Sequence, residues 1–406
     1  MRTDDRIFIL PRHEEIKNGF ITDIYFIRTK EILERDGLDR TIVAAEITVS
    51  SLPSSYSWFV FAGLREVLKL LEGMSLDLYA VPEGTILTPR DVEGVRVPVM
   101  LIVGPYSEFV IYETTILGFL AAASGYATKA ARLRKLAGDT PIINFGARRT
   151  HPALAPFCDY YSYIGGFDAV SCVLGAKLLG LKPVGTMPHS LLIIYRVEKG
   201  DHSLGWVAFD KYMPSDVPRI MLCDTFSDEV EETIRAVEAV GCDRIYGVRL
   251  DTPGSRKGDF SYILREVKWK LMQRGYDKVK VMLSGGINEH NIRELINAGA
   301  DGFGIGSAIA NAPYVDYAMD IVAIFKDDKW VPISKRGKFS GRKKVWLKNS
   351  DKLVVKVTPW NEDLGKNFSQ ILEKYMENGK IVGKFPYPKE TRDYVLSQLK
   401  TYDLKL

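Results

Sequence analysis

Residues 279–307, VKVMLSGGINEHNIRELINAGADGFGIGS, contain two short apolar runs, and each run ends in a glycine-rich turn. The first run leads into Ser284-Gly285-Gly286, and the second leads into Gly304-Ile305-Gly306-Ser307. Between them, Asn288 to Ala298 follows a helical pattern and precedes Gly299, a residue type that commonly ends helices. This order of strand, turn, helix and strand is typical of a β/α unit in a mainly parallel sheet.

The same alternation extends over residues 141–310. Apolar runs alternate there with helical patterns such as Ser227 to Val240, in which Ser227 is the expected cap. A long alanine-rich helix from about Glu113 to Ala137 leads into this region. The predicted strands are Ile142–Phe145, Pro183–Thr186, Ile220–Cys223, Ile245–Val248, Val279–Leu283 and Gly302–Ile305.

The flanking segments have a different pattern. Ile42–Thr48 and Gly94–Tyr106 are β-rich and separated by turn residues, whereas the region after Pro313 is more polar and includes a strand-like Lys352–Thr358. The sequence therefore predicts an α/β protein with an incomplete or irregular β/α (TIM-like) barrel and a mixed α/β N-terminal domain completed by the C-terminal segment. The expected boundaries are 1–112, 113–312 and 313–406.

Composition narrows the class of protein. A length of 406 residues exceeds what one core normally supports. A net charge of +4 with 26% charged residues gives no reason to expect a nucleic acid or membrane partner. The longest apolar stretch, Thr114 to Ala127, is shorter than the roughly 20 residues of a spanning helix, and Met1 to Asp5 shows no targeting pattern, so we expect a cytoplasmic protein. The four cysteines form no C-x-x-C pair, which favours small buried residues over a zinc or dithiol site.

The two glycine-rich turns are candidates for a phosphate site. In β/α barrels function lies at the carboxyl ends of the strands, and the loops after the last two strands often hold a phosphate. Backbone N–H groups at a turn that opens a helix can approach an anion closely. One such turn often reflects only tight packing, but two in succession favour a phosphate site.

Polar side chains follow the other predicted strands. Asp224 and Asp251 carry carboxylates suited to Mg²⁺ or to ribose hydroxyls, although each could instead cap a helix. His189 could be a catalytic group or a structural histidine. Arg148 and Arg149 could bind a carboxylate or a phosphate, and we expect only one of these neighbours to contact the substrate.

Together these residues resemble nicotinate phosphoribosyltransferase, a type II phosphoribosyltransferase, and most closely its shorter, archaeal-type members. The resemblance spans most of the chain in order. It rests on Thr22–Phe26, Asn144–Arg149, Gly165–Ser171, Gly185–Ser190, Asp224–Phe226, Arg249–Asp251, Ser284–Gly286 and Gly304–Ser307.

The resemblance implies transfer of 5-phosphoribosyl from phosphoribosyl pyrophosphate to nicotinate, assisted by Mg²⁺ and with ATP as a possible co-substrate. It also implies a homodimer or a higher homo-oligomer. It assigns catalytic roles to His189, Asp224 and Asp251, with the two aspartates also holding Mg²⁺; in relatives that use ATP the matching histidine is phosphorylated. It assigns substrate binding to Tyr25, which would stack on the pyridine across a subunit boundary, and to Arg148, Asp168, Thr186, Ser190, Arg249, Ser284, Gly285, Gly286, Gly304, Gly306 and Ser307.

Three positions leave alternatives open. Asp168 could face the base, as an acidic group does in nicotinamide-using relatives, or cap the next helix, and we favour the cap. Arg149, Lys335 and Lys338 could approach pyrophosphate, or the two lysines could belong to a solvated basic loop. The zinc knuckle of some archaeal relatives is not expected, because the C-terminal region has no cysteine.

Other activities are possible. A nicotinamide or quinolinate phosphoribosyltransferase would use the same phosphoribosyl site, and quinolinate, with its second carboxylate, calls for extra basic residues. A sugar-phosphate lyase or isomerase is a weaker alternative, because no predicted strand end offers a lysine for a Schiff base. A nucleotide-binding protein without catalytic activity is the third alternative.

Overall fold

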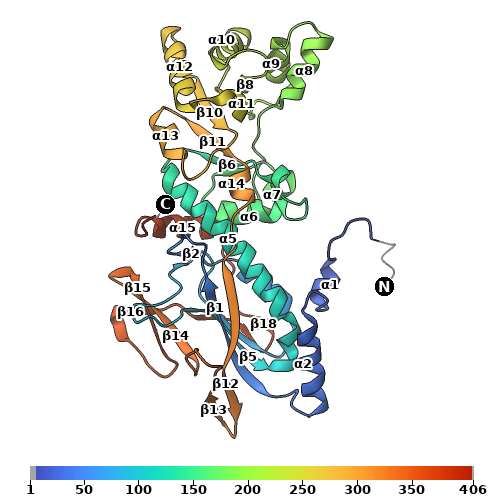
Figure 1. Cartoon of the computed structure of the whole chain (residues 1–406), viewed down its shortest axis with the longest axis vertical. Coiled ribbons are helices and arrows are strands. Elements are labelled where there is room, and N and C mark those ends of the chain that lie inside the picture. The colour runs from blue at the N-terminus through green and yellow to red at the C-terminus, as the bar shows by residue number, and fades with distance from the viewer. Residues whose placement is uncertain (1–5, 405–406) are drawn as a thin grey trace. The chain divides into compact units, whose positions relative to one another are not determined.

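The computed structural model describes residues 6–404, except for the side chains of residues 351–353. Its contacts divide the chain into two compact units. Residues up to Ala131 and from Pro313 onward form one unit, which we call the outer-sequence unit, and Arg132–Ala312 form the parallel-sheet unit. The long helix α5 (Glu113–Ala137), predicted with these bounds, contributes residues to both (Figure 1). The three-part division at residues 112 and 312 stays a prediction.

The outer-sequence unit is built on an antiparallel sheet to which both ends of the chain contribute. Its strand order is β13-β12-β1-β5-β3-β17-β18. The long strand β1 pairs with β5 on one side and β12 on the other. The strands are β1 (Ile42–Ser51), β3 (Asp77–Ala80), β5 (Pro98–Pro105), β12 (Asp316–Lys326), β13 (Lys329–Pro332), β17 (Glu373–Glu377) and β18 (Lys380–Ile381).

Two smaller sheets and several helices complete this unit. Strand β14 lies between β15 and β16 in one sheet, and β2 pairs with β4 in the other. The core brings Leu68 of α3 and Ile116 of α5 against the large sheet, where Ile47 and Ile102 are fully buried. The elements are β2 (Phe59–Val60), β4 (Ile86–Leu87), β14 (Lys343–Lys348), β15 (Asp351–Pro359), β16 (Phe368–Gln370), α1 (His13–Lys17), α2 (Ile24–Arg35), α3 (Leu64–Leu71), α4 (Tyr106–Phe109) and α15 (Pro388–Leu399).

The second unit contains a sheet of order β7-β6-β11-β10-β9-β8 in which neighbouring strands are parallel. Its strands are β6 (Ile142–Asn144), β7 (Ala169–Val170), β8 (Ile220–Leu222), β9 (Gly247–Leu250), β10 (Lys280–Ser284) and β11 (Gly302–Ile305). Its helices are α6 (Ala155–Ile164), α7 (Val173–Leu179), α8 (His189–Glu198), α9 (Ser203–Tyr212), α10 (Glu229–Val240), α11 (Gly254–Lys257), α12 (Phe260–Gln273), α13 (Ile292–Asn297) and α14 (Ser307–Ala310).

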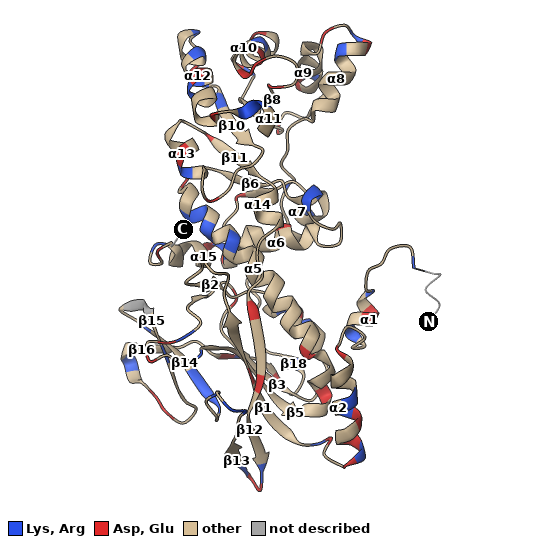
Figure 2. Ribbon diagram, viewed as in Figure 1, with Lys and Arg blue, Asp and Glu red and all other residues tan. Residues whose placement is uncertain are grey.

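The predicted fold class is confirmed, including the completion of the N-terminal sheet by the C-terminal segment. Over the described residues the parallel sheet ends at β7 on one side and at β8 on the other, so it is an open sheet and the barrel is incomplete. Basic and acidic residues are interspersed along the elements (Figure 2), in keeping with the nearly balanced charge.

Several local predictions were wrong. Residues 183–186 form no strand, and a single backbone hydrogen bond from Val184 N to Val170 O (2.9 Å) attaches them to β7. The reason lies in Pro183, which has no N–H to donate. Helix α10 is capped by Asp228 rather than Ser227, because the Asp228 carboxylate accepts from Val230 N and Glu231 N. Helix α13 begins only at Ile292, one turn later than expected.

One helical stretch, Tyr106–Ala137, is long and apolar enough to cross a membrane by length and composition alone. However, 61% of its most apolar window is buried within the fold. Its apolar character is therefore explained by its position in the core.

Candidate active site in the parallel-sheet unit

A cavity of about 600 Å³ lies at the carboxyl ends of the parallel strands. This is where function gathers in α/β sheets, because loops from several strands converge there. Its lining comes from the ends of β6, β7, β9, β10 and β11 and from the segment before α8. The lining residues are Phe145, Ala147–Arg149, Ser171, Gly185–Ser190, Arg249, Asp251, Ser284–Gly286, Gly304, Gly306 and Ser307.

The first glycine turn lies at the end of β10. Gly285 and Gly286 have φ values of 81° and 80°, which favour glycine over residues with a Cβ atom. The Gly286 carbonyl accepts from the side-chain amides of Asn288 (3.0 Å) and Asn291 (2.9 Å). Because α13 starts only at Ile292, the positive end of that helix lies beyond the turn rather than at it, contrary to the prediction.

The second glycine turn lies against an aromatic ring. A Cβ atom on Gly304 would lie 2.2 Å from Cδ2 of Phe145, so only glycine fits there. The following Gly306 and Ser307 also line the cavity, and Ser307 begins the short helix α14. Both turns therefore face the same cavity, as the sequence predicted.

The two aspartates lie side by side at the ends of β8 and β9. Asp224 Oδ2 accepts from the backbone N–H of Asp251 (2.5 Å), and Asp224 does not cap α10. Among residues 6–404, Asp224 Oδ1 is buried without a hydrogen-bond partner. Burial raises the pKa of Asp224 to about 7, and the nearby Asp251 charge adds to this rise.

His189 faces both carboxylates. Its Nε2 atom lies 3.8 Å from Asp224 Oδ1 and 4.0 Å from Asp251 Oδ2, while its Nδ1 atom lies 3.0 Å from the Thr225 hydroxyl. Burial lowers the pKa of His189, so the neutral imidazole prevails at pH 7. The histidine occupies the first position of α8 rather than a strand end.

Arg249 connects the parts of the site. Its guanidinium donates from Nε to Thr186 Oγ1 (2.9 Å), from Nη1 to Ser284 Oγ (3.0 Å) and from Nη2 to Met187 O (3.0 Å). It also lies 3.4 Å from Asp251 Oδ2. Because its donors bind protein groups, the arrangement favours a role in positioning the two loops over the direct substrate contact that the sequence analysis assigned.

Arg148 and Arg149 provide positive charge at the other side of the cavity. Both belong to a turn of 3₁₀ helix, Ala147–Arg149, that follows β6, and both line the cavity. That only one of them contacts the substrate stays a prediction. Neither guanidinium has a hydrogen bond or ion pair with any described residue, so both are available to an anionic ligand.

Four predicted residues lie outside this cluster. Asp168 accepts from Ile142 N (2.8 Å) and pairs with Arg134, so it fixes the start of β6 instead of facing a base or capping a helix. Tyr25, Lys335 and Lys338 belong to the outer-sequence unit. Both lysines pair with the buried Asp320, each at 2.6 Å, while the Lys335 side chain stays 66% exposed, in keeping with the solvated basic loop that was the alternative.

Two polar residues near the cavity, Lys257 and Glu232, were not predicted from the sequence. Lys257, in α11, donates to Gly285 O at the first glycine turn, so a lysine does lie near a strand end. The buried Glu232 accepts from the backbone N–H groups of Thr225 (2.8 Å), Phe226 (2.7 Å) and Ser227 (3.1 Å) and so holds the loop after Asp224. Glu232 gave no sequence signal, because it occupies an ordinary helix position.

The residues present fit a hard divalent cation. Asp224 Oδ1 and Asp251 Oδ2 both face His189, and the former has no partner among the described residues. Mg²⁺ is commonly held by one or two carboxylates together with water and substrate oxygens. Over residues 6–404 there is no group of three or more candidate metal-ligating side chains, so a complete protein cage is absent.

Comparisons with known proteins cover most of the chain. The family model described as quinolinate phosphoribosyl transferase, N-terminal domain, matches residues 23–124, and the model of its C-terminal domain matches residues 126–320. A solved structure titled nicotinate-nucleotide pyrophosphorylase from Pyrococcus furiosus is 45% identical, covers 99% of this chain and 100% of that chain, and superimposes with a TM-score of 0.91.

More distant relatives are named nicotinate or nicotinic acid phosphoribosyltransferase. Nicotinate phosphoribosyltransferase of Bacillus subtilis is 29% identical over 371 residues, which cover 80% of this chain and 72% of that protein. The structure of human nicotinic acid phosphoribosyltransferase covers 94% of both chains with a TM-score of 0.76, and at 19% identity it supports the fold alone.

Proposed function

Because the chain belongs to the quinolinate phosphoribosyltransferase family and is thus a phosphoribosyltransferase, we propose that it transfers 5-phosphoribosyl from phosphoribosyl pyrophosphate to a pyridine carboxylate, with quinolinate as the first candidate. One observation carries this proposal. A single cavity is lined by two glycine turns, by Asp251 and by two arginines without internal partners. These are anchors for a phosphate, a ribose and carboxylates.

The family assignment corrects the resemblance drawn from the sequence. The matching family models are those of quinolinate phosphoribosyltransferase, whereas the nicotinate phosphoribosyltransferases of B. subtilis and Mycobacterium tuberculosis are 29% and 27% identical. The motifs misled because glycine turns and strand-end aspartates hold the phosphoribosyl group. That group is the same for every acceptor, so such motifs do not identify the base.

The proposed mechanism uses three zones of the cavity. Backbone N–H groups around Ser284–Gly286 and Gly304–Ser307 bind the 5-phosphate, and Asp251 holds ribose hydroxyls. The pyridine nitrogen donates its lone pair to the anomeric carbon while the bond to the pyrophosphate oxygen breaks, and pyrophosphate leaves with that electron pair. With quinolinate, the bond from the ring to the 2-carboxylate then breaks, carbon dioxide leaves and the ring carbon takes a proton. The site accelerates transfer by aligning these atoms.

Asp224 and Asp251 would hold Mg²⁺ in this proposal. Bound there, the cation would neutralise developing charge on pyrophosphate. Asp224 is ionised in only part of the population near pH 7 without the cation, since its pKa is about 7. The proposed metal therefore competes with a proton for this carboxylate.

The two arginines favour quinolinate. Nicotinate carries one carboxylate and quinolinate carries two, so an acceptor site for quinolinate needs more positive charge. Arg148 and Arg149 both line the cavity, and both are exposed to it without an internal partner among the described residues. Thr186 and Ser190 also line the cavity and could orient one carboxylate.

Nicotinate is the second candidate, because several curated relatives are named nicotinate phosphoribosyltransferase. Use of ATP belongs to this second candidate. Burial lowers the pKa of His189, which favours the unprotonated ring nitrogen that a phosphoryl transfer needs. A homo-oligomer in which Tyr25 reaches a neighbouring site and a cytoplasmic location also remain proposals. Tyr25 is 56% exposed and thus accessible to another copy.

One assay separates the candidates. Phosphoribosyl pyrophosphate and Mg²⁺ are mixed with quinolinate, nicotinate or nicotinamide, with and without ATP, and pyrophosphate and carbon dioxide are measured. Quinolinate should yield both products in equal amounts. Asp251→Ala should abolish turnover, whereas Asp243→Ala, which removes an exposed carboxylate, should not. Pyrophosphate without carbon dioxide, seen only with nicotinate, would support the second candidate, and no turnover with any base would refute both.

A further inference from the structure

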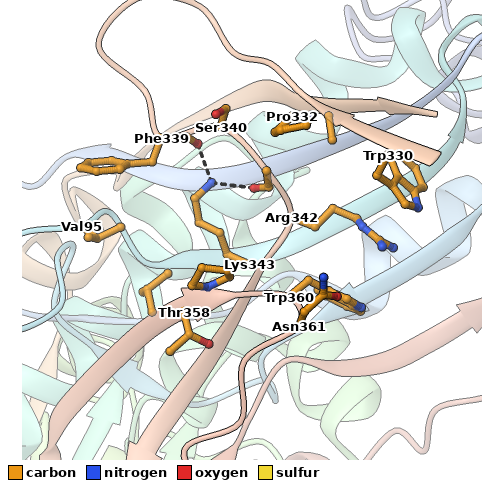
Figure 3. A pocket seen from close by; sticks show the side chains of 14 residues that line it. Val95, Trp330, Pro332, Phe339, Ser340, Arg342, Lys343, Thr358, Trp360 and Asn361 are labelled. Atoms are coloured by element: carbon orange, nitrogen blue, oxygen red, sulfur yellow. Dashed lines mark hydrogen bonds between the residues drawn. The ribbon is translucent and has the colours of Figure 1, made fainter. Parts of the chain in front are cut away.

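A second hollow, of about 390 Å³, lies in the outer-sequence unit beside β13, β14 and β15 (Figure 3). Its volume falls within the range of small-molecule sites. The candidate active site contributes none of its residues. The walls are mainly apolar and aromatic, with a few polar groups: Val95, Ala323, Trp330, Pro332, Phe339–Lys343 and Val357–Asn361.

Arg342 is held between two indole rings in this hollow (Figure 3). The carbon of its guanidinium lies 4.4 Å from the ring centroid of Trp330 and 5.0 Å from that of Trp360. Stacking of this kind covers the two faces of the guanidinium and leaves its N–H groups at the edge. Among residues 6–404 the Arg342 side chain has cation–π contacts but no hydrogen bond or ion pair.

The neighbouring lysine behaves differently. The Lys343 ammonium is buried and donates to Glu46 Oε2 (2.7 Å), Phe339 O (2.6 Å) and Gly341 O (3.1 Å), so all three of its N–H groups are used. Figure 3 shows the two carbonyl contacts of this lysine. Its role is to fix the loop before β14, whereas the donors of Arg342 are not used within the described chain.

The aromatic walls are themselves fixed. The Trp360 ring meets Tyr79 edge-on with centroids 5.3 Å apart, and Trp330 packs on Phe325 at the same centroid distance. An arginine whose rotamer is locked by such walls loses little freedom when it binds a ligand. Burial lowers the pKa of Arg342, so the charged form has lost favourable solvation that an anion would replace.

We propose that this hollow binds a small ligand in which an apolar body carries a carboxylate or a phosphate. The anionic oxygens pair in the plane of the Arg342 guanidinium, a geometry that both groups match. The apolar body lies against Trp330 and Pro332, which line the same hollow. The side chains of Ser340 and Asn361 supply further polar contacts at its wall.

Benzoate, phenyl phosphate and the uncharged benzamide are suitable probes for the full-length protein. The readout is the NMR chemical shifts of the indole N–H groups of Trp330 and Trp360, which report on this hollow and not on the active-site cavity. Trp330→Phe and Trp360→Phe variants serve to assign the two resonances. Saturable shifts with benzoate or phenyl phosphate support the proposal, and the tighter of the two identifies the anionic group. Benzamide should bind at least about tenfold more weakly, the loss expected from one charged contact.

Two variants test the role of the guanidinium. Arg342→Met keeps the length of the side chain and should weaken anion binding about tenfold or more. Arg342→Lys keeps the positive charge but lacks the planar pair of N–H donors, so it should weaken anion binding less than Arg342→Met. It also provides a second measurement in case Arg342→Met misfolds. Arg148→Met, in the candidate active site, should leave the Trp330 and Trp360 shifts unchanged. Equal binding of benzamide and benzoate, unchanged binding by Arg342→Met, or absence of shifts with both anions would overturn the proposal.

Discussion

Replacement of Arg249 by lysine tests how the candidate active site is held together. The guanidinium makes three hydrogen bonds, to Thr186, Met187 and Ser284, from three different nitrogens. A lysine ammonium in the same place keeps the charge near Asp251 but reaches at most one of these acceptors. At least two bonds from a charged donor are then lost, each at a cost of about 1.5 kcal/mol or more, so Arg249→Lys should lower the free energy of unfolding by roughly 3 kcal/mol or more.

Urea denaturation measures this loss through the midpoint and the m-value. Arg249→Met should be less stable still, because it also leaves Asp251 without the cation 3.4 Å away. Arg274→Lys is the matched control: that arginine is 50% exposed and, among the described residues, pairs only with Glu238, so its change should stay within about 0.5 kcal/mol. If Arg249→Lys were as stable and as active as the control, the proposed positioning role would be wrong.

Three further changes give distinct outcomes. Gly304→Ala should displace the Phe145 ring, which a Cβ atom would approach to 2.2 Å, and so raise the KM for phosphoribosyl pyrophosphate; an unchanged KM would contradict the packing argument. The pKa of Asp224 rises from 3.8 to about 7 on folding, so its protonated form stabilises the fold below pH 4 and that contribution is lost as the pH rises through 7. Between pH 5 and pH 8 the unfolding free energy of the wild type should therefore fall by roughly 2 to 3 kcal/mol more than that of Asp224→Asn. Equal changes in the two proteins would count against the raised pKa of Asp224. Glu232→Gln should lower kcat because an amide cannot accept from all three N–H groups of the loop after Asp224, whereas the exposed Glu231→Gln should not; equal kcat values for both would exclude that role.

Much of the fold could be predicted because its signals are local. The alternation of apolar runs and helical patterns identified β6, β8, β9, β10 and β11, and the strand order places their carboxyl ends beside one another. Glycine turns were informative for the same reason, since Gly285 and Gly286 adopt backbone conformations that other residues rarely adopt. The short β7 was missed because two residues, Ala169 and Val170, carry no periodic pattern.

Contacts between distant segments could not be predicted. Arg249 appeared to be a substrate ligand, but its donors are taken by groups more than 30 residues away in the sequence, which no local pattern reveals. Asp168 illustrates the same limit, because its partners Ile142 and Arg134 lie 26 and 34 residues before it in the sequence. The family was assigned to the nicotinate rather than the quinolinate enzymes, because the strongest motifs, the glycine turns and strand-end aspartates, do not distinguish between related phosphoribosyltransferases.

The most direct test of the proposed activity is the ratio of carbon dioxide to pyrophosphate formed from quinolinate and phosphoribosyl pyrophosphate. Quinolinate carries two carboxylates, and Arg148 and Arg149 both line the cavity. We predict a ratio of one for the wild type and a loss of turnover with quinolinate in the Arg148→Met, Arg149→Met double variant. Absence of both products from quinolinate, with pyrophosphate formed only from nicotinate, would contradict quinolinate as the acceptor.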